Sequence, residues 1–229
     1  MQPPAINHNK SARRGCWILV APIVMVSLIV GAYVLVGLLG FFGNTATGVR
    51  QVLHYNSCPA ADDILLARAT EMGLGNPVLS HVGSLTTLTV TLPENAESAG
   101  NIPATIAAKG RLSIATNTSE ELFNPENIVS VSLSVGMLGE SMVVLELTEE
   151  EVNTFKTNID RVGEAIATFD GEPFSLIKPK DINKKGQLKM IPTAHDPKTQ
   201  INMAARAHIL LNDGQLPCNV TLSSIQTAQ

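Results

Sequence analysis

The side chains that most often carry out chemistry are scattered along this chain rather than grouped. Five histidines occur, with no pair at i, i+4 and no acidic companion at metal-ligand spacing. We therefore predict no metal site and no cofactor, and we interpret the histidines as ordinary core or surface residues. They are His8, His54, His81, His195 and His208.

Serines and glutamates give no catalytic pattern either. Ser130, Ser132 and Ser134 alternate with aliphatic residues, as side chains on the solvated face of a strand do, and no nucleophile-elbow sequence occurs. Glu149, Glu150 and Glu151 fall where a helix is expected to begin, and acidic side chains interact favourably with that end of a helix. No glycine-rich phosphate loop is present. We expect a protein that is not an enzyme.

The longest uncharged segment runs from Cys16 to Phe42, between Arg14 and Arg50. A helix needs about 20 apolar residues to cross a bilayer core of about 30 Å, so the segment predicts a single transmembrane anchor in the lipid bilayer. The alternative is a cleaved signal peptide, whose apolar core usually has about 7–15 residues. This segment is longer, which favours the anchor.

Charges beside this segment predict its orientation. Lys10, Arg13 and Arg14 precede it, and positive residues stay in the cytoplasm. We expect a cytoplasmic tail at 1–15, an anchor at 16–42 in the inner (plasma) membrane, and a periplasmic or extracytoplasmic domain after it. The formal net charge of −4 makes nucleic acid an unexpected partner.

Two of the three cysteines lie in the part predicted to be exported, where an oxidising compartment allows pairing. Cys58 follows the first predicted strand and Cys218 opens the last. A bridge between them requires Cα atoms within about 7 Å. The alternative is that both are small buried hydrophobic residues. Cys16 lies at the cytoplasmic edge of the predicted anchor.

The first half of the exported part alternates strands and helices. Residues 49–55 and 77–81 have strand patterns, and Leu88, Val90 and Leu92 alternate with threonines. Asp62 begins a short amphipathic helix, and a second helix is predicted at 99–108 before a strand at 110–115. The order strand-helix-strand-strand-helix-strand predicts a ferredoxin-like base.

A second module follows the polar loop 116–127. Residues 129–135 and 143–147 predict a meander, and Thr148 with Glu151 forms a capping box for the next helix. Asp170-Gly171 predicts a tight hairpin, because both central positions of such a turn need positive φ. We interpret 118–196 as an inserted α+β head subdomain.

Signals near the end of the chain predict a return to the base. Asp196 can cap a helix with Pro197 at its first position, Gly214 ends that helix, and 219–225 is a final strand. The predicted fold is α+β, with one transmembrane helix followed by a ferredoxin-like base at 43–117 and 197–229. The head at 118–196 is inserted between these two segments.

Several segments resemble the first periplasmic domain of SecD, the accessory subunit of the Sec preprotein translocase. The first block has a helix-to-strand segment (Ala67–Leu79), a strand that ends in Leu-Pro (Thr89–Pro93) and the start of the next strand (Gly110–Leu112). The second block has a strand (Val143–Leu147) and the Asp-Gly hairpin of a head subdomain (Val162–Ser175). The third block has a closing helix and a Gly-x-Leu-Pro turn (Ile209–Pro217).

The resemblance implies a membrane-anchored, extracytoplasmic SecD-like module that assists protein translocation. Its expected partners are exported polypeptides or subunits of the Sec translocase. SecD proteins continue into five further transmembrane helices that carry the proton-linked activity, whereas this sequence stops at Gln229, so we do not expect a complete proton-driven subunit. The alternative is a structural or sensory envelope module that reuses the fold for another ligand.

Overall fold

The computed structural model describes residues 48–93, 101–183 and 185–227, and residues 45–229 form one compact unit. The predicted anchor at 16–42 and the tail at 1–15 lie outside the described residues. Within the described ranges, no helix combines the length and the apolar character needed to span a bilayer. The fold of the described residues is α+β, with three small antiparallel sheets.

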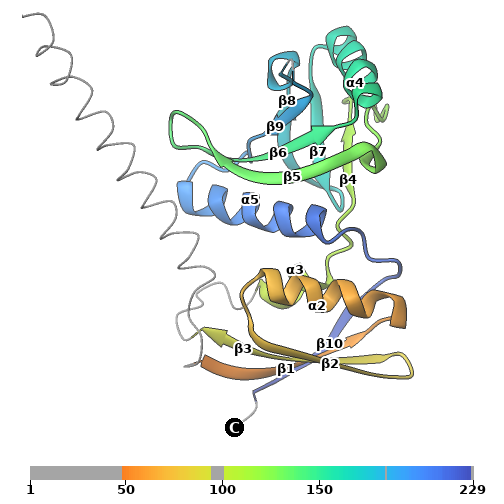
Figure 1. Ribbon diagram of the computed structural model, residues 1–229, viewed down its shortest axis with the longest axis vertical. Helices are drawn as coiled ribbons and strands as arrows, with labels where there is room; N and C mark the ends of the chain where they lie inside the picture. Colours follow the sequence, from red (N-terminus) through yellow and green to blue (C-terminus); the bar gives the residue numbers. More distant parts are fainter. Residues whose placement is uncertain (1–47, 94–100, 184, 228–229) are drawn as a thin grey trace, which may run out of the picture. The chain divides into compact units, whose positions relative to one another are not determined.

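A four-stranded sheet contains the first and last strands, in the order β10-β1-β3-β2. Its strands are β1 (Gly48–Asn56), β2 (Gly75–Val82), β3 (Leu85–Pro93) and β10 (Thr221–Thr227). Helices α2 (Asp62–Glu71), after the short η1 (Pro59–Ala61), and α3 (Ile102–Ala107) cover one face (Figure 1). We call these elements the four-stranded part.

The core of the four-stranded part lies between this sheet and its two helices. Leu53 and Tyr55 of β1 and Leu88 and Val90 of β3 pack against Leu65 of α2, and all five side chains are buried. The intervening threonines of β3 are half-buried, apart from the fully buried Thr86. The alternation of Leu and Val with Thr along β3 therefore gives the sheet one apolar and one polar face.

Two three-stranded sheets make up the rest of the described structure. One has the order β4-β7-β8, from β4 (Leu112–Ala115), β7 (Ala165–Phe169) and β8 (Glu172–Ile177). The other has the order β5-β6-β9, from β5 (Ile128–Val135), β6 (Ser141–Leu147) and β9 (Gln187–Met190). With α4 (Glu149–Val162), α5 (Pro197–Asn212) and the short η2 (Pro125–Asn127) and η3 (Pro179–Asp181), they form the two-sheet part.

One continuous core holds the two-sheet part together, with two edge-to-face phenylalanine pairs inside it. Phe123 and Phe155 have ring centroids 5.6 Å apart, and those of Phe169 and Phe174 are 5.0 Å apart. Such pairs add about 0.5–1.5 kcal/mol to the free energy gained from burial.

The ends of α4 and α5 follow from local sequence. Thr148 Oγ1 accepts from the Glu151 backbone N–H at the start of α4 (3.4 Å). The reciprocal half of the predicted capping box is replaced, because the Glu151 carboxylate accepts instead from Asn124 N and Asn127 Nδ2. At α5, Asp196 Oδ1 accepts from Thr199 N at 2.9 Å, as predicted for an N-cap.

Two elements predicted for the base, a strand and a helix, belong instead to the two-sheet part. The strand at 110–115 pairs with β7 as β4, because Leu112 and Ile114 pack in the core of the two-sheet part. The position beside β1 is taken by β10. The helix that begins at Pro197 also belongs to the two-sheet part, where its buried Ala204, Ala207 and Leu210 pack in the same core.

The chain therefore passes between the two parts at residues 108–111 and 213–216, not at the predicted loops 116–127 and 178–196. The two passages lie side by side, since Leu216 N donates to Lys109 O at 3.0 Å. The division of the chain into two separate domains stays a prediction, with a base at 43–117 and 197–229 and a head at 118–196.

Candidate functional site

A cleft of about 480 Å³ lies in the two-sheet part, beside the last turn of α5. Its walls are the first half of β5, the segment before it and the beginning of β4. The residues are Gly110, Leu112, Asn124, Pro125, Glu126, Ile128, Val129, Ser130, Val131, Leu210, Leu211, Asn212, Gly214 and Gln215.

The outer edge of β5 is one wall of this cleft. β5 pairs with β6 on its inner side, and no described strand pairs with its outer side. The pairing register shifts between Ile128 and Ser130, so the intervening Val129 has no partner on β6 and is 61% exposed. An edge strand presents unpaired N–H and C=O groups to any extended chain that approaches it.

The beginning of β4 is the second wall. Its inner side pairs with β7, whereas the outer side of its far end is covered by a bridge from Ala115 to Glu121 and by Leu122 N donating to Ile114 O at 2.8 Å. Leu112, at the beginning of β4, is fully buried and lines the inside of the cleft. The edge strand β5 of one sheet and Leu112 of the other thus border one cleft.

The side chains and backbone around the cleft suit an uncharged ligand. Glu126 is the one charged residue among its lining residues, and the others are aliphatic, small or amide-bearing. No group of three or more His, Cys, Asp or Glu residues that could hold a metal ion occurs in the described ranges. The cleft offers hydrogen-bonding groups and apolar contacts.

Arg68 of α2 connects the passages between the two parts. Its guanidinium is fully buried and donates to Ile106 O at 2.9 Å, to Ala108 O, and to Gly214 O at 2.7 Å. These carbonyls lie at the C-terminal ends of α3 and α5, where a cation is favourable. Burial lowers the pKa of Arg68 to about 10, so the side chain stays charged at neutral pH.

Gly110 is required beside this guanidinium. Its φ is +78°, and a Cβ there would lie 2.8 Å from Arg68 Nη2 and 3.1 Å from Leu210 O. Any side chain would displace the cation or the end of α5. Gly110 therefore lets the chain pass between Arg68 and the cleft.

Asp213, which lies near Arg68, also has the Glu71 carboxyl group beside it. Glu71 lies 3.0 Å from His208 Nδ1 and accepts from Asn212 Nδ2 at 3.3 Å. Burial and the neighbouring Glu71 carboxylate raise the pKa of Asp213 to about 6, against the opposing effect of Arg68. Asp213 Oδ2 and Arg68 Nε are buried without a hydrogen-bond partner among the described residues.

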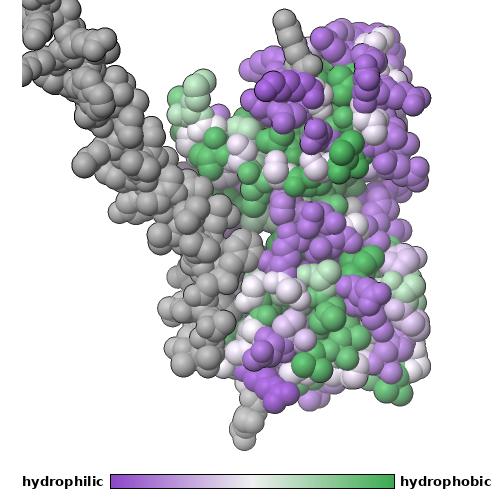
Figure 2. Space-filling view, viewed as in Figure 1, coloured by the Kyte–Doolittle hydropathy of each residue, from purple (hydrophilic) through white to green (hydrophobic). Residues whose placement is uncertain are grey.

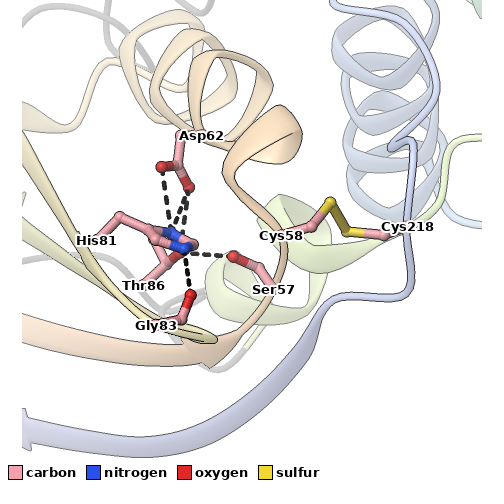
Figure 3. Close-up of polar contacts among 7 residues, drawn as sticks. All are labelled: Ser57, Cys58, Asp62, His81, Gly83, Thr86 and Cys218. Atoms are coloured by element: carbon pink, nitrogen blue, oxygen red, sulfur yellow. Dashed lines mark hydrogen bonds and ion pairs between the residues drawn. A yellow bond between two sulfur atoms is a disulfide. The ribbon is translucent and has the colours of Figure 1, made fainter.

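A polar cluster lies in the four-stranded part, where the end of β1 meets the β2–β3 turn (Figure 3). Thr86 Oγ1 donates to Asp62 Oδ1 at 3.1 Å and lies 2.5 Å from Ser57 Oγ. His81 Nδ1 lies 2.7 Å from Thr86 Oγ1 and 3.2 Å from the Asp62 carboxylate. His81 Nε2 must donate to Gly83 O, 2.6 Å away, because a carbonyl can only accept.

This cluster contains Ser, His and Asp but not a nucleophile–base pair. Ser57 bonds to Thr86 rather than to His81, and the remaining nitrogen of His81 is engaged by Gly83. A general base must hydrogen-bond the group whose proton it removes. The cluster instead connects η1 and α2 to the β2–β3 hairpin.

Beside it, Cys58 and Cys218 form a disulfide with Cα atoms 6.4 Å apart (Figure 3). It joins the residue before η1 to the segment that leads into β10, across a sequence separation of 160 residues.

The other residues singled out in the sequence stay apart. His54 Nδ1 lies 3.1 Å from Thr87 Oγ1 on the four-stranded sheet. His195 is exposed just before α5, and His8 lies outside the described residues. Glu149 and Glu150 are exposed in the first turn of α4, and Glu151 is buried. The sequence interpretation missed Arg68 and the cleft, although an uncharged run from Ile128 to Gly139 was visible.

No family model matches the chain, and no curated protein matches it in sequence. Its fold is similar to solved SecDF structures. "Crystal structure of SecDF in Super-membrane-facing form" has a TM-score of 0.58 and 13% identity, over 88% of this chain and 35% of that chain. "Structure and function of a membrane component SecDF that enhances protein export" has a TM-score of 0.56 and 14% identity, over 79% of this chain and 100% of that chain.

At these identities the likeness establishes a SecD-like fold and no more. This chain spans 35% of the SecDF chain in the first of these structures.

Proposed function

We propose that this protein is a SecD-like module that binds extended segments of exported polypeptides in the cleft between β4 and β5. The observation that carries the proposal is that the outer edge of β5, which has no strand partner in the described structure, borders a cleft. An extended peptide can add to such an edge through its backbone, while neighbouring pockets receive alternate side chains. The likeness of the fold to SecDF supports protein export as the setting.

The lining of the cleft favours polypeptides that are still unfolded. A folded protein has few free backbone groups to offer, since nearly all of them are already paired. A chain that has not yet folded offers N–H and C=O groups along its whole length. Binding through the backbone is therefore broad in sequence but selective for the extended state.

The proposal includes the finer predictions from the sequence. The protein is held in the inner (plasma) membrane by residues 16–42, with the tail in the cytoplasm and the remainder extracytoplasmic. It works by binding rather than by catalysis, with a ferredoxin-like base and an inserted head, and it contacts subunits of the Sec translocase. Co-purification of the full chain with the translocase separates this proposal from an envelope module with an unrelated ligand.

Fluorescence anisotropy with labelled peptides tests the cleft directly. The probe has an uncharged block of alternating Val and Ser, eight residues long to match β5, with a lysine at each end. We expect the full-length protein, in detergent, to bind it, and Val129→Lys to weaken binding about tenfold, because edge charges oppose strand addition. Leu176→Lys is the matched control, since Leu176 is an exposed aliphatic residue of β8 that does not line the cleft.

A second probe isolates the backbone contribution. It has the same sequence with every second amide N-methylated. Two versions are made, and each blocks the N–H groups along one of the two edges of the peptide strand. One version should lose binding while the other keeps it, because an added strand pairs through one edge only. Equal binding of both versions, or no binding of the unmethylated probe, contradicts the proposal.

A further inference from the structure

The turn that joins β5 to β6 exposes two large apolar side chains. Met137 is 104% exposed and Leu138 is 95% exposed, the highest exposures among the large hydrophobic residues described. Figure 2 shows hydrophobic surface at the tip of this hairpin, beyond the strands. Adjacent exposed apolar residues of this size are typical of a surface that contacts something else.

Hydrogen bonds hold the turn in a defined conformation. Gly136 N donates to Glu140 O at 2.8 Å, and Gly139 N donates to Gly136 O at 3.1 Å. Leu138 N donates to Glu140 Oε2 at 3.0 Å. The Glu140 carboxylate occupies the position that a side chain at residue 136 would need, so a larger residue there would displace the carboxylate from Leu138 N. The backbone of the turn thus has partners inside the turn, while both apolar side chains point outward.

The tip continues the uncharged edge that begins in the cleft. From Ile128 to Gly139 the chain carries no charged residue, and Val129 and Val135 of β5 are also exposed. Six residues separate these valines, about 20 Å of strand. A chain added along β5 from the cleft would therefore reach Met137 and Leu138.

Charge and size decide between occupants of the tip. The charged residues between Ile128 and Leu147 are Glu140 and Glu146, so the hairpin has no basic residue to attract anionic lipid. Two side chains from each of two copies bury on the order of 500 Å², well below the roughly 1,200 Å² of a stable interface. An uncharged, extended polypeptide fits both the neutral edge and the flexible thioether of methionine, which adapts to varied partners.

We propose that Met137 and Leu138 form a second anchor for the polypeptide bound in the cleft. This inference rests on the proposed function. The anchor selects chains that carry apolar side chains about six to nine residues beyond the segment in the cleft, given the length of β5. The protein therefore selects a polypeptide by the spacing of its apolar side chains as well as by its extended backbone.

Two peptides separate the anchor from the cleft. The short probe is the alternating Val-Ser block described above, and the long probe adds a Leu-Leu pair eight residues beyond the centre of that block. In the full-length protein, Met137→Ser with Leu138→Ser should weaken the long probe about tenfold, which is about 1.4 kcal/mol, and leave the short probe unchanged. Leu176→Ser is the matched control, and circular dichroism verifies that each variant is folded.

The possible results are distinct. If the double variant binds the long probe like the wild type while Val129→Lys weakens both probes, the anchor is overturned and the proposed function stands. If the wild type binds neither probe, both fall. A long probe with its Leu-Leu pair moved next to the block should lose its advantage, and an unchanged advantage overturns selection by spacing.

A photoreactive residue identifies the occupant directly. Leu138→benzoylphenylalanine in the full-length protein is irradiated with the long probe in bicelles of phosphatidylcholine and phosphatidylglycerol. A peptide adduct found by mass spectrometry supports the anchor. A lipid adduct or a crosslinked dimer as the main product overturns it in favour of a membrane surface or a second copy.

Discussion

In the four-stranded part, polar side chains and a disulfide connect the ends of neighbouring elements, whereas in the two-sheet part the edge strand β5 borders a cleft. Thr86, His81 and Asp62 bond the β2–β3 hairpin to the start of α2, and Cys58 is joined to Cys218. In the two-sheet part, the outer edge of β5 has no strand partner among the described residues, and no disulfide is described there. Both parts have edge strands among the described residues, but the cleft is lined by an edge strand of the two-sheet part.

This difference shows that two α+β units with similar strands can be held together by different kinds of contact. An open edge without charge is an aggregation hazard that proteins usually avoid. Here the edge is held on a core with two phenylalanine pairs, and the passages to it are fixed by Arg68. We infer that the four-stranded part and the Arg68 contacts keep the edge of β5 in one conformation.

Removing Arg68 should have the largest effect on this arrangement. Arg68→Met leaves the carbonyls of Ile106, Ala108 and Gly214 without their donor and leaves Asp213 without a nearby cation. We expect the free energy of unfolding to fall by about 3–5 kcal/mol. Urea unfolding followed by circular dichroism measures it. The control is Arg206→Met, because Arg206 is exposed and 3.9 Å from Glu172, and a loss as small as that control's contradicts the prediction.

Opening the disulfide should have the next largest effect. Cys58→Ala with Cys218→Ala frees a chain segment of 160 residues in the unfolded state, which corresponds to at most about 5 kcal/mol and more typically 2–4 kcal/mol. Urea unfolding with and without reductant gives the value. Reductant should lower the stability of the wild type but not of the double variant. An equal response in both proteins would refute this assignment.

Local sequence predicted most elements of both parts. Asp170 and Gly171 have φ values of 51° and 86°, as the Asp-Gly turn requires, and Asp196 caps α5 as predicted. Which core an element joins was not predictable in the same way. Leu112 and Ile114 alternate like the strands of either part, so their pairing with β7 depends on distant residues.

The functional residues were harder to predict for the same reason. The carbonyl partners of Arg68 lie 38, 40 and 146 residues away in sequence, and no local pattern links them. The cleft is formed by segments from β4, β5 and the end of α5, and it exists only once the two sheets are placed. Its one local signal is the uncharged run along β5.

Within the four-stranded part, Thr86→Val should have a smaller effect. The change keeps the shape of a fully buried side chain but removes the hydroxyl that contacts Ser57, Asp62 and His81. We expect a loss of about 1–2 kcal/mol in urea unfolding. Thr70→Val is the control, since its hydroxyl bonds only within α2 and is exposed. Equal losses for the two variants would mean that the cluster does not stabilise the hairpin.

The smallest expected effect concerns pH at the passages between the parts. The pKa of Asp213 is raised to about 6 by burial and by Glu71, so the folded state binds this proton more tightly than the unfolded state, where the pKa is near 3.8. The resulting stability is fully present below pH 3.8 and is lost as pH rises through about 6. Because the side chain is partly solvated and Arg68 opposes the shift, we expect about 1 kcal/mol.

Asp213→Asn isolates this contribution. Asparagine carries no charge to repel Glu71, while the neighbouring side chains Arg68, Glu71, His208 and Asp170 are the same in both proteins. Relative to the wild type, the variant should therefore gain about 1 kcal/mol between pH 4 and pH 7.5. Urea unfolding at both pH values gives the difference. A constant difference would show that Asp213 ionises alike in the folded and unfolded states, and that the contact between α2 and the end of α5 does not respond to pH.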